Sequence, residues 1–332
     1  MRAQWGLLPI ALVAGCGART ELGSSEGPPL PCTKSPWVVF DYDSPQSQRF
    51  GIAAMRADGS SFHQLDLSGV VGVFPSVAPD SKSMVYLVVN SDAAQTVEAL
   101  NVFDFASRTN RTLVQLTVDS DNEPGLGMAA ISPDNQLVAY STRGFDLGVR
   151  VVGFDGSNDR VLGLSPWNGW VYGRPVFSPG SSTVYASTFL GRLESIHTDG
   201  TGRTLLEDPV NSSWAGPADF PANPSFSPDH TRLVAQISCK AAELRVFSLD
   251  DLPGDPCTAG TKLVEVEKTP SWNQAANAAW GPSNLIAYES GKDIMLIDPA
   301  SGAPSNLTAS ITKGPNDVAS DPTWASGCAE LP

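Results

Sequence analysis

Apolar and polar positions along this chain follow a long-period pattern, in which short apolar runs are separated by turns rich in Pro, Gly, Asp and Ser. One near-repeat occurs six times: FPSVAPD (74–80), MAAISPD (128–134), RPVFSPG (174–180), NPSFSPD (223–229), NAAWGPS (277–283) and DPTWASG (321–327). Equivalent positions are separated by 44 residues (Pro282 to Ser326) to 54 residues (Pro79 to Pro133). Strand-based repeats of about 40–50 residues are typical of propeller blades, because one unit cannot bury its own apolar face.

Further apolar runs follow each copy of the motif. One of them alternates, as in SMVYLVV (83–89) and NLIAYES (284–290), and the next resembles LNVFDF (100–105). Such runs, rich in Val, Ile, Leu and Tyr and bounded by turn residues, predict strands. A second turn, often Asp-Gly as at Asp58-Gly59, then leads to an outer strand. The sequence therefore predicts an all-β fold with almost no helix: a six-bladed β-propeller of four-stranded antiparallel blades.

The two ends of the chain each supply part of one blade. The last copy, DPTWASG, provides an inner strand and ends just before Cys328, whereas PWVVFDYD (36–43) and GIAAMRADGSSFHQLD (51–66) provide the other strands without an inner one. Joined, they complete one shared blade, which closes the ring and leaves no open sheet edge. Cys32 and Cys328 flank the missing turn, so we expect a disulfide there that stabilises the ring by about 2–4 kcal/mol.

The pattern P-x-[WF]-S-P-D, followed by a strand of the L-V-A-Y type and a DG turn, resembles the TolB-type β-propeller, a WD40-like repeat family of bacterial envelopes. The resemblance covers about residues 36–327 and is specific for the fold but weak for function. TolB proteins also have a sizeable α/β domain before the propeller, whereas a short tether precedes it here. Tol-system activity is therefore not implied for this chain.

The N-terminal residues predict export and lipidation. MRAQWGLLPIALVAGC has one basic residue and then an apolar stretch too short to span a bilayer, as in a secretory signal. Leu-Val-Ala-Gly before Cys16 looks like a bacterial lipobox, which implies acylation of Cys16; the alternative is an ordinary signal with an incidental cysteine. Gly17 is not Asp, so this resemblance favours the outer membrane. The predicted organisation is a signal peptide (1–15), a lipidated cysteine and flexible tether (16–35), the propeller (36–328) and a tail (329–332).

Composition agrees with a protein of the bacterial cell envelope. The 332 residues carry a formal net charge of −14, which argues against nucleic acid as a partner and against electrostatic docking to anionic lipid. Membrane attachment is therefore expected only through the lipid anchor, on a monomer. Five cysteines become four once Cys16 is acylated, an even number for an oxidising compartment. By elimination Cys239 pairs with Cys257, but the two lie at opposite edges of their blade, so this pairing is left open.

Motifs that carry catalytic chemistry are absent from the sequence. The Gly-x-Ser-x-Gly string at 23–27 lies in the tether, without the strand-to-helix elbow of a hydrolase. The three histidines, His63, His197 and His230, fall in different blades. Acidic strings at Asp119-x-Asp121-x-Glu123 and Asp41-x-Asp43 could supply oxygen ligands to calcium, but the first lacks the Gly turn and distal Glu of an EF-hand loop. Solvated acidic loops are therefore the preferred interpretation, and calcium binding is left open. No catalytic residue, metal or cofactor is expected.

Two groups of residues are candidate binding surfaces. The first is a set of aromatic residues in the long connections between blades, namely Trp167, Trp170, Tyr172, Trp214 and Trp272. These could anchor a peptide or stack on a sugar, or they could fill gaps between blades. The second is a polar mouth of the central channel, formed by residues at the start of inner strands: Arg174, Asn223, Asn277 and Asp321. A water-filled channel without a ligand is the alternative for this second group.

Two functional hypotheses follow from the sequence. The preferred one is a non-catalytic, lipid-anchored envelope protein whose propeller is a binding or scaffold module for a protein or glycan partner. The alternative is a propeller hydrolase or lyase acting on peptide or polysaccharide. Propeller enzymes of this kind use clustered histidines or an additional hydrolase domain, and neither is evident in this chain.

Overall fold

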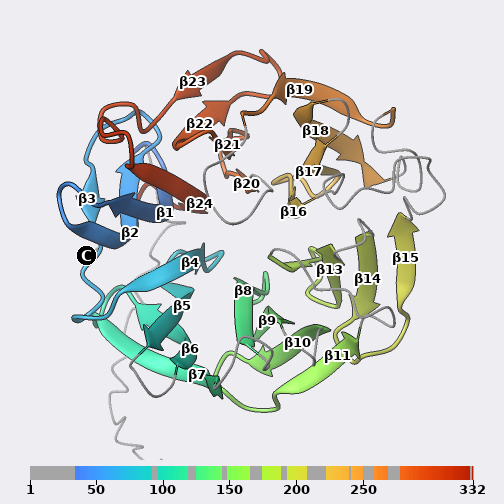
Figure 1. The fold of residues 1–332 in the computed structure, drawn as a ribbon. Coiled ribbons are helices and arrows are strands. Elements are labelled where there is room, and N and C mark those ends of the chain that lie inside the picture. Colours follow the sequence, from blue (N-terminus) through green and yellow to red (C-terminus); the bar gives the residue numbers. More distant parts are fainter. Residues whose placement is uncertain are drawn as a thin grey trace, which may run out of the picture. The chain divides into compact units, whose positions relative to one another are not determined.

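In the computed structural model, the regular secondary structure of the described residues consists of strands (Figure 1). The described residues are 34–91, 96–118, 125–143, 148–164, 174–187, 193–207, 222–238, 241–249, 258–267, 277–329 and 331. They form six antiparallel sheets of four strands each, arranged as blades around a central axis. The described ranges hold no apolar helix of membrane-spanning length.

The strands of each blade follow one another from the axis outward. The closure blade consists of β24 (Val318–Ala325), β1 (Trp37–Ser44), β2 (Arg49–Arg56) and β3 (His63–Gln64). Blade 2 consists of β4 (Gly72–Val77), β5 (Ser83–Ser91), β6 (Thr96–Asp104) and β7 (Thr109–Val118), and blade 3 of β8 (Gly125–Ile131), β9 (Leu137–Arg143), β10 (Gly148–Gly153) and β11 (Arg160–Leu164). Blade 4 consists of β12 (Val176–Phe177), β13 (Thr183–Ser187), β14 (Leu193–His197) and β15 (Thr204–Glu207). Blade 5 consists of β16 (Ala222–Phe226), β17 (Arg232–Ser238), β18 (Ala242–Ser248) and β19 (Thr261–Glu265), and blade 6 of β20 (Ala278–Trp280), β21 (Ile286–Ser290), β22 (Asp293–Ile297) and β23 (Pro304–Asn306).

The repeated motif forms the tight turn between the inner strand and the second strand of a blade. In five blades the residue after the motif has a left-handed backbone, and its N–H donates to the carbonyl three residues earlier, as Asn135 does to Ser132 at 2.9 Å. Proline one residue after that carbonyl fixes the φ angle that such a turn needs. The left-handed residues are Ser81, Asn135, Ser181, His230 and Asn284.

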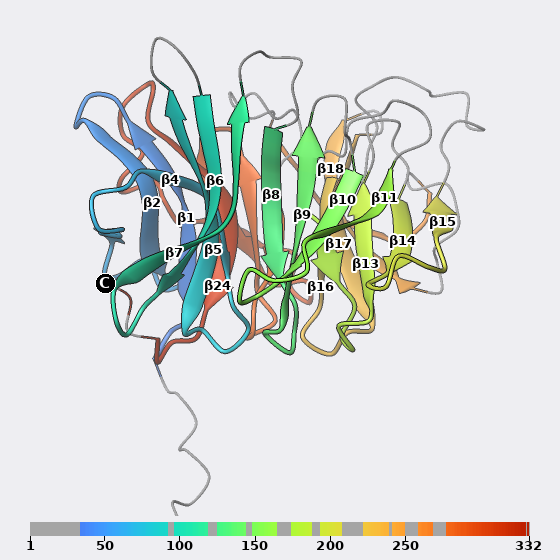
Figure 2. The same ribbon diagram turned by 90° about the horizontal axis from the view of Figure 1, so that it is seen from below.

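Alternating strand direction gives the propeller two distinct faces. The inner strands run toward the face that carries the motif turns, which we call the turn face, as β8 does in Figure 2. The outer strand of each blade returns to the opposite face, which we call the loop face, before the next blade begins. Binding residues on one face are therefore separated from those on the other by the length of an inner strand.

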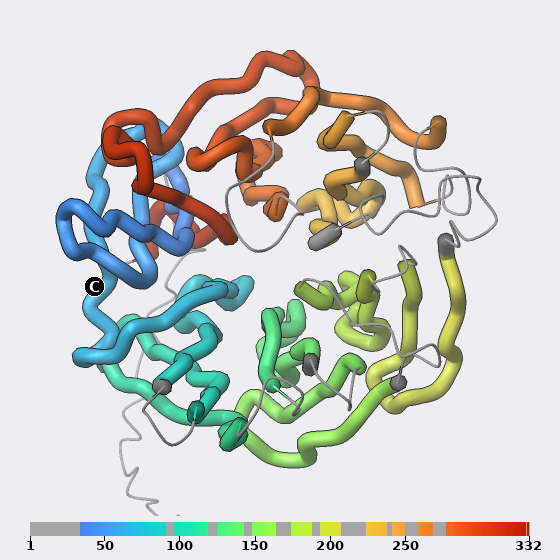
Figure 3. The backbone as a smooth tube through the Cα atoms, in the orientation of Figure 1, coloured from blue at the N-terminus to red at the C-terminus, as the bar shows by residue number. Residues whose placement is uncertain are grey.

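Pairing between the two ends of the chain closes the ring. Strand β24 is antiparallel to β1, with Trp37 opposite Ala325 and Val38 opposite Trp324. Figure 3 shows the start and the end of the tube, blue and red, side by side in this blade. Every blade therefore has a complete set of four strands, and the last blade is completed by strands from both ends of the chain.

Side chains and backbone at the turn-face end of this seam hold the two ends together. The guanidinium of Arg56 lies 4.0 Å from the ring centre of Trp37 and donates to the carbonyls of Ser35 (2.5 Å) and Gly327 (2.8 Å). The indole of Trp37 donates to the carbonyl of Ala329 at 3.1 Å. A Cβ atom on Gly327 would overlap the backbone of Lys34, so only glycine permits this close approach.

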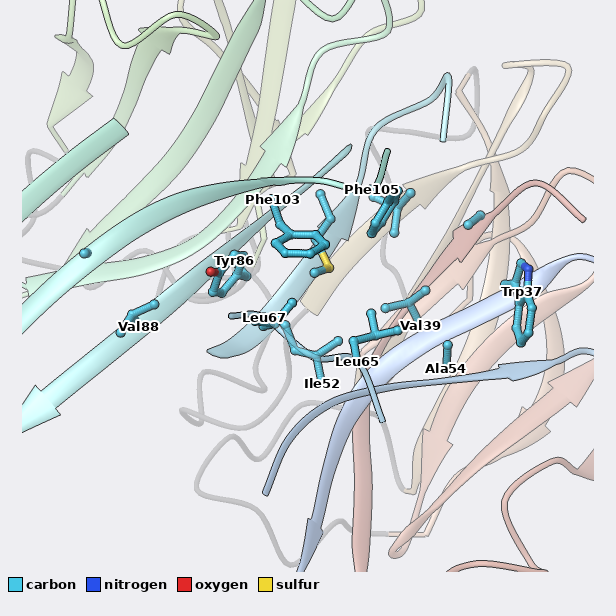
Figure 4. Close-up of a cluster of buried hydrophobic side chains, with 14 residues drawn as sticks. Trp37, Val39, Ile52, Ala54, Leu65, Leu67, Tyr86, Val88, Phe103 and Phe105 are labelled. Atoms are coloured by element: carbon cyan, nitrogen blue, oxygen red, sulfur yellow. The ribbon is translucent and has the colours of Figure 1, made fainter. Parts of the chain in front are cut away.

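Apolar side chains fill the space between neighbouring blades. The cluster in Figure 4 joins the closure blade to blade 2 and includes Trp37, Val39, Ile52, Tyr86 and Phe103. Both faces of each sheet pack against a neighbour, so the strands carry more apolar residues than a sheet with one solvated face. The seam is thus supported by side-chain packing as well as by strand pairing.

These observations confirm the predicted fold, including the six blades and the blade shared by both ends. Residues 1–33 lie outside the described residues, so the signal peptide, Cys16 and most of the tether stay predictions. Cys328 is disulfide-bonded. The other four cysteines, including Cys239 and Cys257, lie outside the described ranges, so the Cys32–Cys328 pair also stays a prediction.

We expect the substitution Gly327→Ala to lower the free energy of unfolding by about 2 kcal/mol, because the new methyl group overlaps backbone that cannot move without opening the seam. Gly180→Ala is the matched control, since the nearest atom to its Cβ is the Ser182 hydroxyl oxygen at 3.9 Å. Urea unfolding followed by tryptophan fluorescence measures both. Equal stability of the two variants would contradict a tightly packed seam.

Candidate functional site at the propeller axis

Bulges in the inner strands turn backbone groups toward the axis. The register of β4 against β5 shifts between Val73 and Ser76, and that of β24 against β1 shifts at the equivalent place. The first bulge residues, Phe74 and Asp321, have φ angles of 58° and 54°, which non-glycine residues rarely adopt. Each is followed by a proline, which has no backbone N–H and therefore leaves no donor unpaired where the bulge interrupts the strand hydrogen bonds.

Arg174 spans the axis and contacts the bulges on the opposite side of the ring. It lies two residues before β12 of blade 4, which is across the axis from the closure blade (Figure 1). Its guanidinium donates to the carbonyl of Pro75 at 2.7 Å and to that of Pro322 at 3.4 Å. One side chain therefore links three blades at this level of the channel.

Two carboxyl groups and an amide form a network beside Arg174. The Nδ2 group of Asn277 donates to Glu289 Oε1 (2.7 Å) and to Asp321 Oδ1 (2.6 Å), and the backbone N–H of Asp321 donates to the same Glu289 oxygen (2.6 Å). These three residues are at most 4% exposed. The network joins blade 6 to the closure blade.

Asp41 of β1 adds a third carboxyl group. Its two oxygens accept from the backbone N–H of Phe74 at 3.0 and 2.9 Å, which links the closure blade to blade 2. Asp41 and Arg174 are only partly buried, unlike the other members. We call Asp41, Arg174, Asn277, Glu289 and Asp321 the axial network.

Burial and mutual repulsion make these carboxyl groups hold protons more strongly than usual. Burial is the largest cause for each, and it raises the pKa of Asp321 to about 6 and, together with the charge of Asp321, raises the pKa of Glu289 to about 8. The pKa of Asp41 is raised well above its usual range by the same two effects. Burial lowers the pKa of Arg174, while the three carboxylates oppose that change. Three acids thus surround one guanidinium and cannot all be ionised near neutrality.

Two buried oxygens of the network, Asn277 Oδ1 and Glu289 Oε2, have no hydrogen-bond partner among the described residues. An unpaired buried carboxylate oxygen is costly, whereas a neutral carboxyl group costs much less to bury. This agrees with the raised pKa of Glu289.

A cavity of about 250 Å³ lies along the axis beneath the network. Arg174 and Asn277 are at its inner end, and the motif-turn residues Pro133 and His230 are at the other. Inner-strand residues of several blades form its walls: Ser76, Val77, Ala130, Ile131, Val176, Phe177, Ser225, Phe226, Ala278, Ala279, Trp280, Thr323 and Trp324. Because His230 is exposed, the cavity opens on the turn face.

The structure brings together three of the four residues predicted for the channel mouth. Arg174, Asn277 and Asp321 belong to the axial network, but Asn277 and Asp321 are buried within it and form no open mouth. Asn223 lies in β16, and its side chain is outside the described part of the chain. The aromatic candidates all lie outside the described residues: Trp167, Trp170, Tyr172, Trp214 and Trp272.

Asp41 and Glu289 were missed by the sequence analysis. The interpretation of Asp41 as part of a solvated loop is wrong, because it lies within β1 and accepts from Phe74. Strand register places Asp41 and Glu289 at equivalent positions of the second strand. The other blades have no acid there; the equivalents are Leu87, Ser141, Ser187 and Gln236.

Histidines and metal ligands do not gather anywhere in the described ranges. His63 and His197 lie in outer parts of the closure blade and blade 4, while His230 lies in a turn of blade 5. Among the described residues no group of three or more His, Cys, Asp or Glu side chains could hold a metal ion. The string from Asp119 to Glu123 lies outside them.

Proton binding by the axial network makes stability depend on pH. Because the pKa of Glu289 is raised to about 8, the folded protein keeps a proton that the unfolded chain releases above its usual pKa of 4.5. The stabilisation is complete below about pH 4.5 and is lost as the pH rises through about 8, by at most about 1.4 kcal/mol per pH unit for one proton. Glu289→Gln, neutral in both states, should therefore gain stability relative to the unaltered protein between pH 5 and pH 9.

Urea titrations at several pH values measure this difference. Glu265→Gln is the control, since its carboxylate is 69% exposed and lies outside the network. If the difference between Glu289→Gln and the unaltered protein is constant with pH, Glu289 does not hold the proton.

Comparison with solved structures shows the fold that this chain shares with other proteins. TolB from Acinetobacter baumannii matches with a TM-score of 0.60 and 14% identity over 87% of this chain, and this chain spans 66% of that protein's length. A protein of unknown function from Bacteroides thetaiotaomicron matches with a TM-score of 0.54 and 13% identity, over 78% of this chain and 67% of the other.

An oligogalacturonate lyase in complex with manganese has a TM-score of 0.49 at 14% identity, over 77% of this chain and 70% of the other, which is too weak to bear on activity. No protein-family model matches the sequence, and no curated protein matches it either. The match to TolB from Acinetobacter baumannii, together with the six four-stranded blades, confirms the predicted resemblance to TolB-type propellers at the level of the fold.

Proposed function

We propose that this chain is a non-catalytic, lipid-anchored protein of the bacterial cell envelope, whose propeller presents its loop face to a protein or glycan partner. The observation that carries the proposal is the place where the chain enters the ring. Trp37, the first residue of β1, lies opposite Ala325 at the turn face, and Lys34 lies beside Gly327. An anchor at Cys16 would therefore hold the propeller from its turn face and leave the loop face free.

The length of the tether supports this arrangement. About 20 residues of flexible chain span on the order of 25 Å on average and about 65 Å when extended. That reach allows the propeller to stand clear of the lipid surface and to reorient. The net charge of −14 gives the protein no electrostatic attraction to anionic lipid. Acyl chains on Cys16 are therefore the proposed means of attachment to the membrane.

The aromatic segments are bracketed by strands whose ends lie on the loop face. Trp167, Trp170 and Tyr172 fall between β11 and β12, Trp214 falls between β15 and β16, and Trp272 falls between β19 and β20. Each of these connections joins an outer strand to the next inner strand, over three successive blades. Aromatic side chains are frequent anchors of protein and sugar partners, which supports a contact surface here.

The alternative function, hydrolysis or cleavage of peptide or polysaccharide, has no specific observation in its favour. The acids of the axial network accept hydrogen bonds from a buried amide and from backbone N–H groups.

We expect Cys16→Ser to move the protein from the membrane fraction to the soluble fraction, because lipidation needs the thiol and nothing else in the proposal retains it. Fractionation of cells followed by immunoblotting measures this. A variant that stays in the membrane fraction after a high-salt wash would overturn the lipid anchor.

We expect the double substitution Trp170→Ala and Trp214→Ala to weaken capture of the envelope partner at least tenfold, which is typical of losing central aromatic contacts. Val161→Ala is the control, since Val161 is an exposed residue (45%) of the outer strand β11. Quantitative pull-down from envelope extracts measures capture, and thermal unfolding monitors the fold. Unchanged capture by a folded double variant would exclude the loop-face surface.

A further inference from the structure

The axial cavity reaches the axial network at its inner end, where Arg174 and Asn277 line it. It follows the inner strands from Arg174 and Asn277 to the exposed turn residue His230, and it opens on the turn face. Val176, Ser225 and Phe226 keep part of their surface exposed although they lie on inner strands. The lining residues come from the inner strands of every blade, so the cavity lies on the axis itself.

The charge of this cavity differs from that of the whole protein. The chain has a net charge of −14, yet no acidic residue is among the described residues that line the cavity. Arg174 is the lining residue with a permanent charge, and it is partly exposed. The walls beside it include apolar side chains, among them Val77, Ile131 and Val176, as well as hydroxyl groups. A guanidinium in such surroundings pairs more strongly with a carboxylate than it would in water.

The size and the remaining polar groups limit the ligand. A volume of about 250 Å³ is below the roughly 300–1,000 Å³ of pockets for drug-sized molecules. It suits one sugar ring or one small amino-acid derivative. Hydroxyl groups of Ser76, Ser225 and Thr323 on the walls can meet polar groups of the ligand body.

We propose that the axial cavity binds a small molecule bearing one carboxylate, which pairs with Arg174 at the inner end while the rest of the molecule lies between the walls of the cavity. This inference goes beyond the proposed envelope function. The cavity opens on the turn face, whereas the proposed partner surface is on the loop face.

Binding is coupled to protons, because Arg174 already faces carboxyl groups from three strands: Asp41 of β1, Glu289 of β21 and Asp321 of β24. A ligand carboxylate competes with these groups for the guanidinium. Competition is weakest when they are protonated, and the pKa of Asp321 is about 6 and that of Glu289 about 8. An ordinary carboxylic acid, with a pKa near 4, stays ionised throughout this range. Affinity should therefore rise as the pH falls from 8 to 6, by up to about tenfold per pH unit for each proton taken up.

Calorimetric titration of the full-length protein in detergent tests the proposal. The probes are D-glucuronate and N-acetyl-L-alanine, with D-glucose and N-acetyl-L-alanine amide as their neutral counterparts. We expect at least one acid to bind at least tenfold more tightly than its counterpart, and about tenfold more tightly at pH 6 than at pH 8. Which acid binds distinguishes a sugar acid from an amino-acid derivative as the natural class.

Variants assign the binding to the cavity. Arg174→Gln should weaken acid binding at least tenfold, whereas Arg203→Gln, which removes a guanidinium that pairs with Glu194 and does not line the cavity, should change it less than threefold. If Arg174→Gln does not fold, the comparison of acids with neutral counterparts on the unaltered protein decides. Absence of saturable binding up to millimolar concentrations, equal affinity for acid and neutral probe, or full affinity in a folded Arg174→Gln variant would each overturn the proposal.

Discussion

Pairing between β24 and β1 is the contact on which the rest of the structure depends. Each blade packs both of its faces against neighbours, so a blade that lacked its inner strand would expose apolar surface on two sides and an unpaired edge at the axis. The seam joins residues nearly 290 positions apart, from Trp37 to Ala325. It is supported by Arg56, which binds carbonyls from both ends of the chain, and by a glycine that lets the two backbones touch.

The same pairing creates the chemistry of the axis. Because β1 lies beside β24, Asp41 is opposite Ser320, next to Asp321. Blade 6 adds Glu289, and blade 4 adds Arg174 from across the channel. One guanidinium cannot compensate three carboxylates in a buried setting, so the network retains protons. The ring is thus closed by contacts whose strength depends on pH, at the point where the two ends of the chain meet.

The sequence predicted the fold well because the fold repeats. Six copies of one turn motif indicate the blade number without any knowledge of tertiary contacts, and five of them have a proline at the turn and then a residue with a left-handed backbone. Three axial residues were predicted because they occupy one position of that motif, as Arg174 and Asp321 do. Asp41 and Glu289 could not be found in this way, since their equivalence depends on strand register in two different blades and on which side chains the ring brings together. Buried acids that meet an arginine from the opposite blade produce no recognisable pattern in the sequence around them.

Ring geometry also explains how one small domain can keep two surfaces independent. The inner strands separate the turn face, where the chain enters and the cavity opens, from the loop face, where the long connections begin and end. Changes in the loops therefore need not disturb the axis, which is fixed by strand bulges and by hydrogen bonds to backbone carbonyls. Conversely, an anion at Arg174 alters the balance of charge among Asp41, Glu289 and Asp321, all of which bind groups at the seam or beside it. Ligand binding in the cavity and proton binding by the axial network consequently depend on the same charged groups. Both also affect the contacts that close the ring.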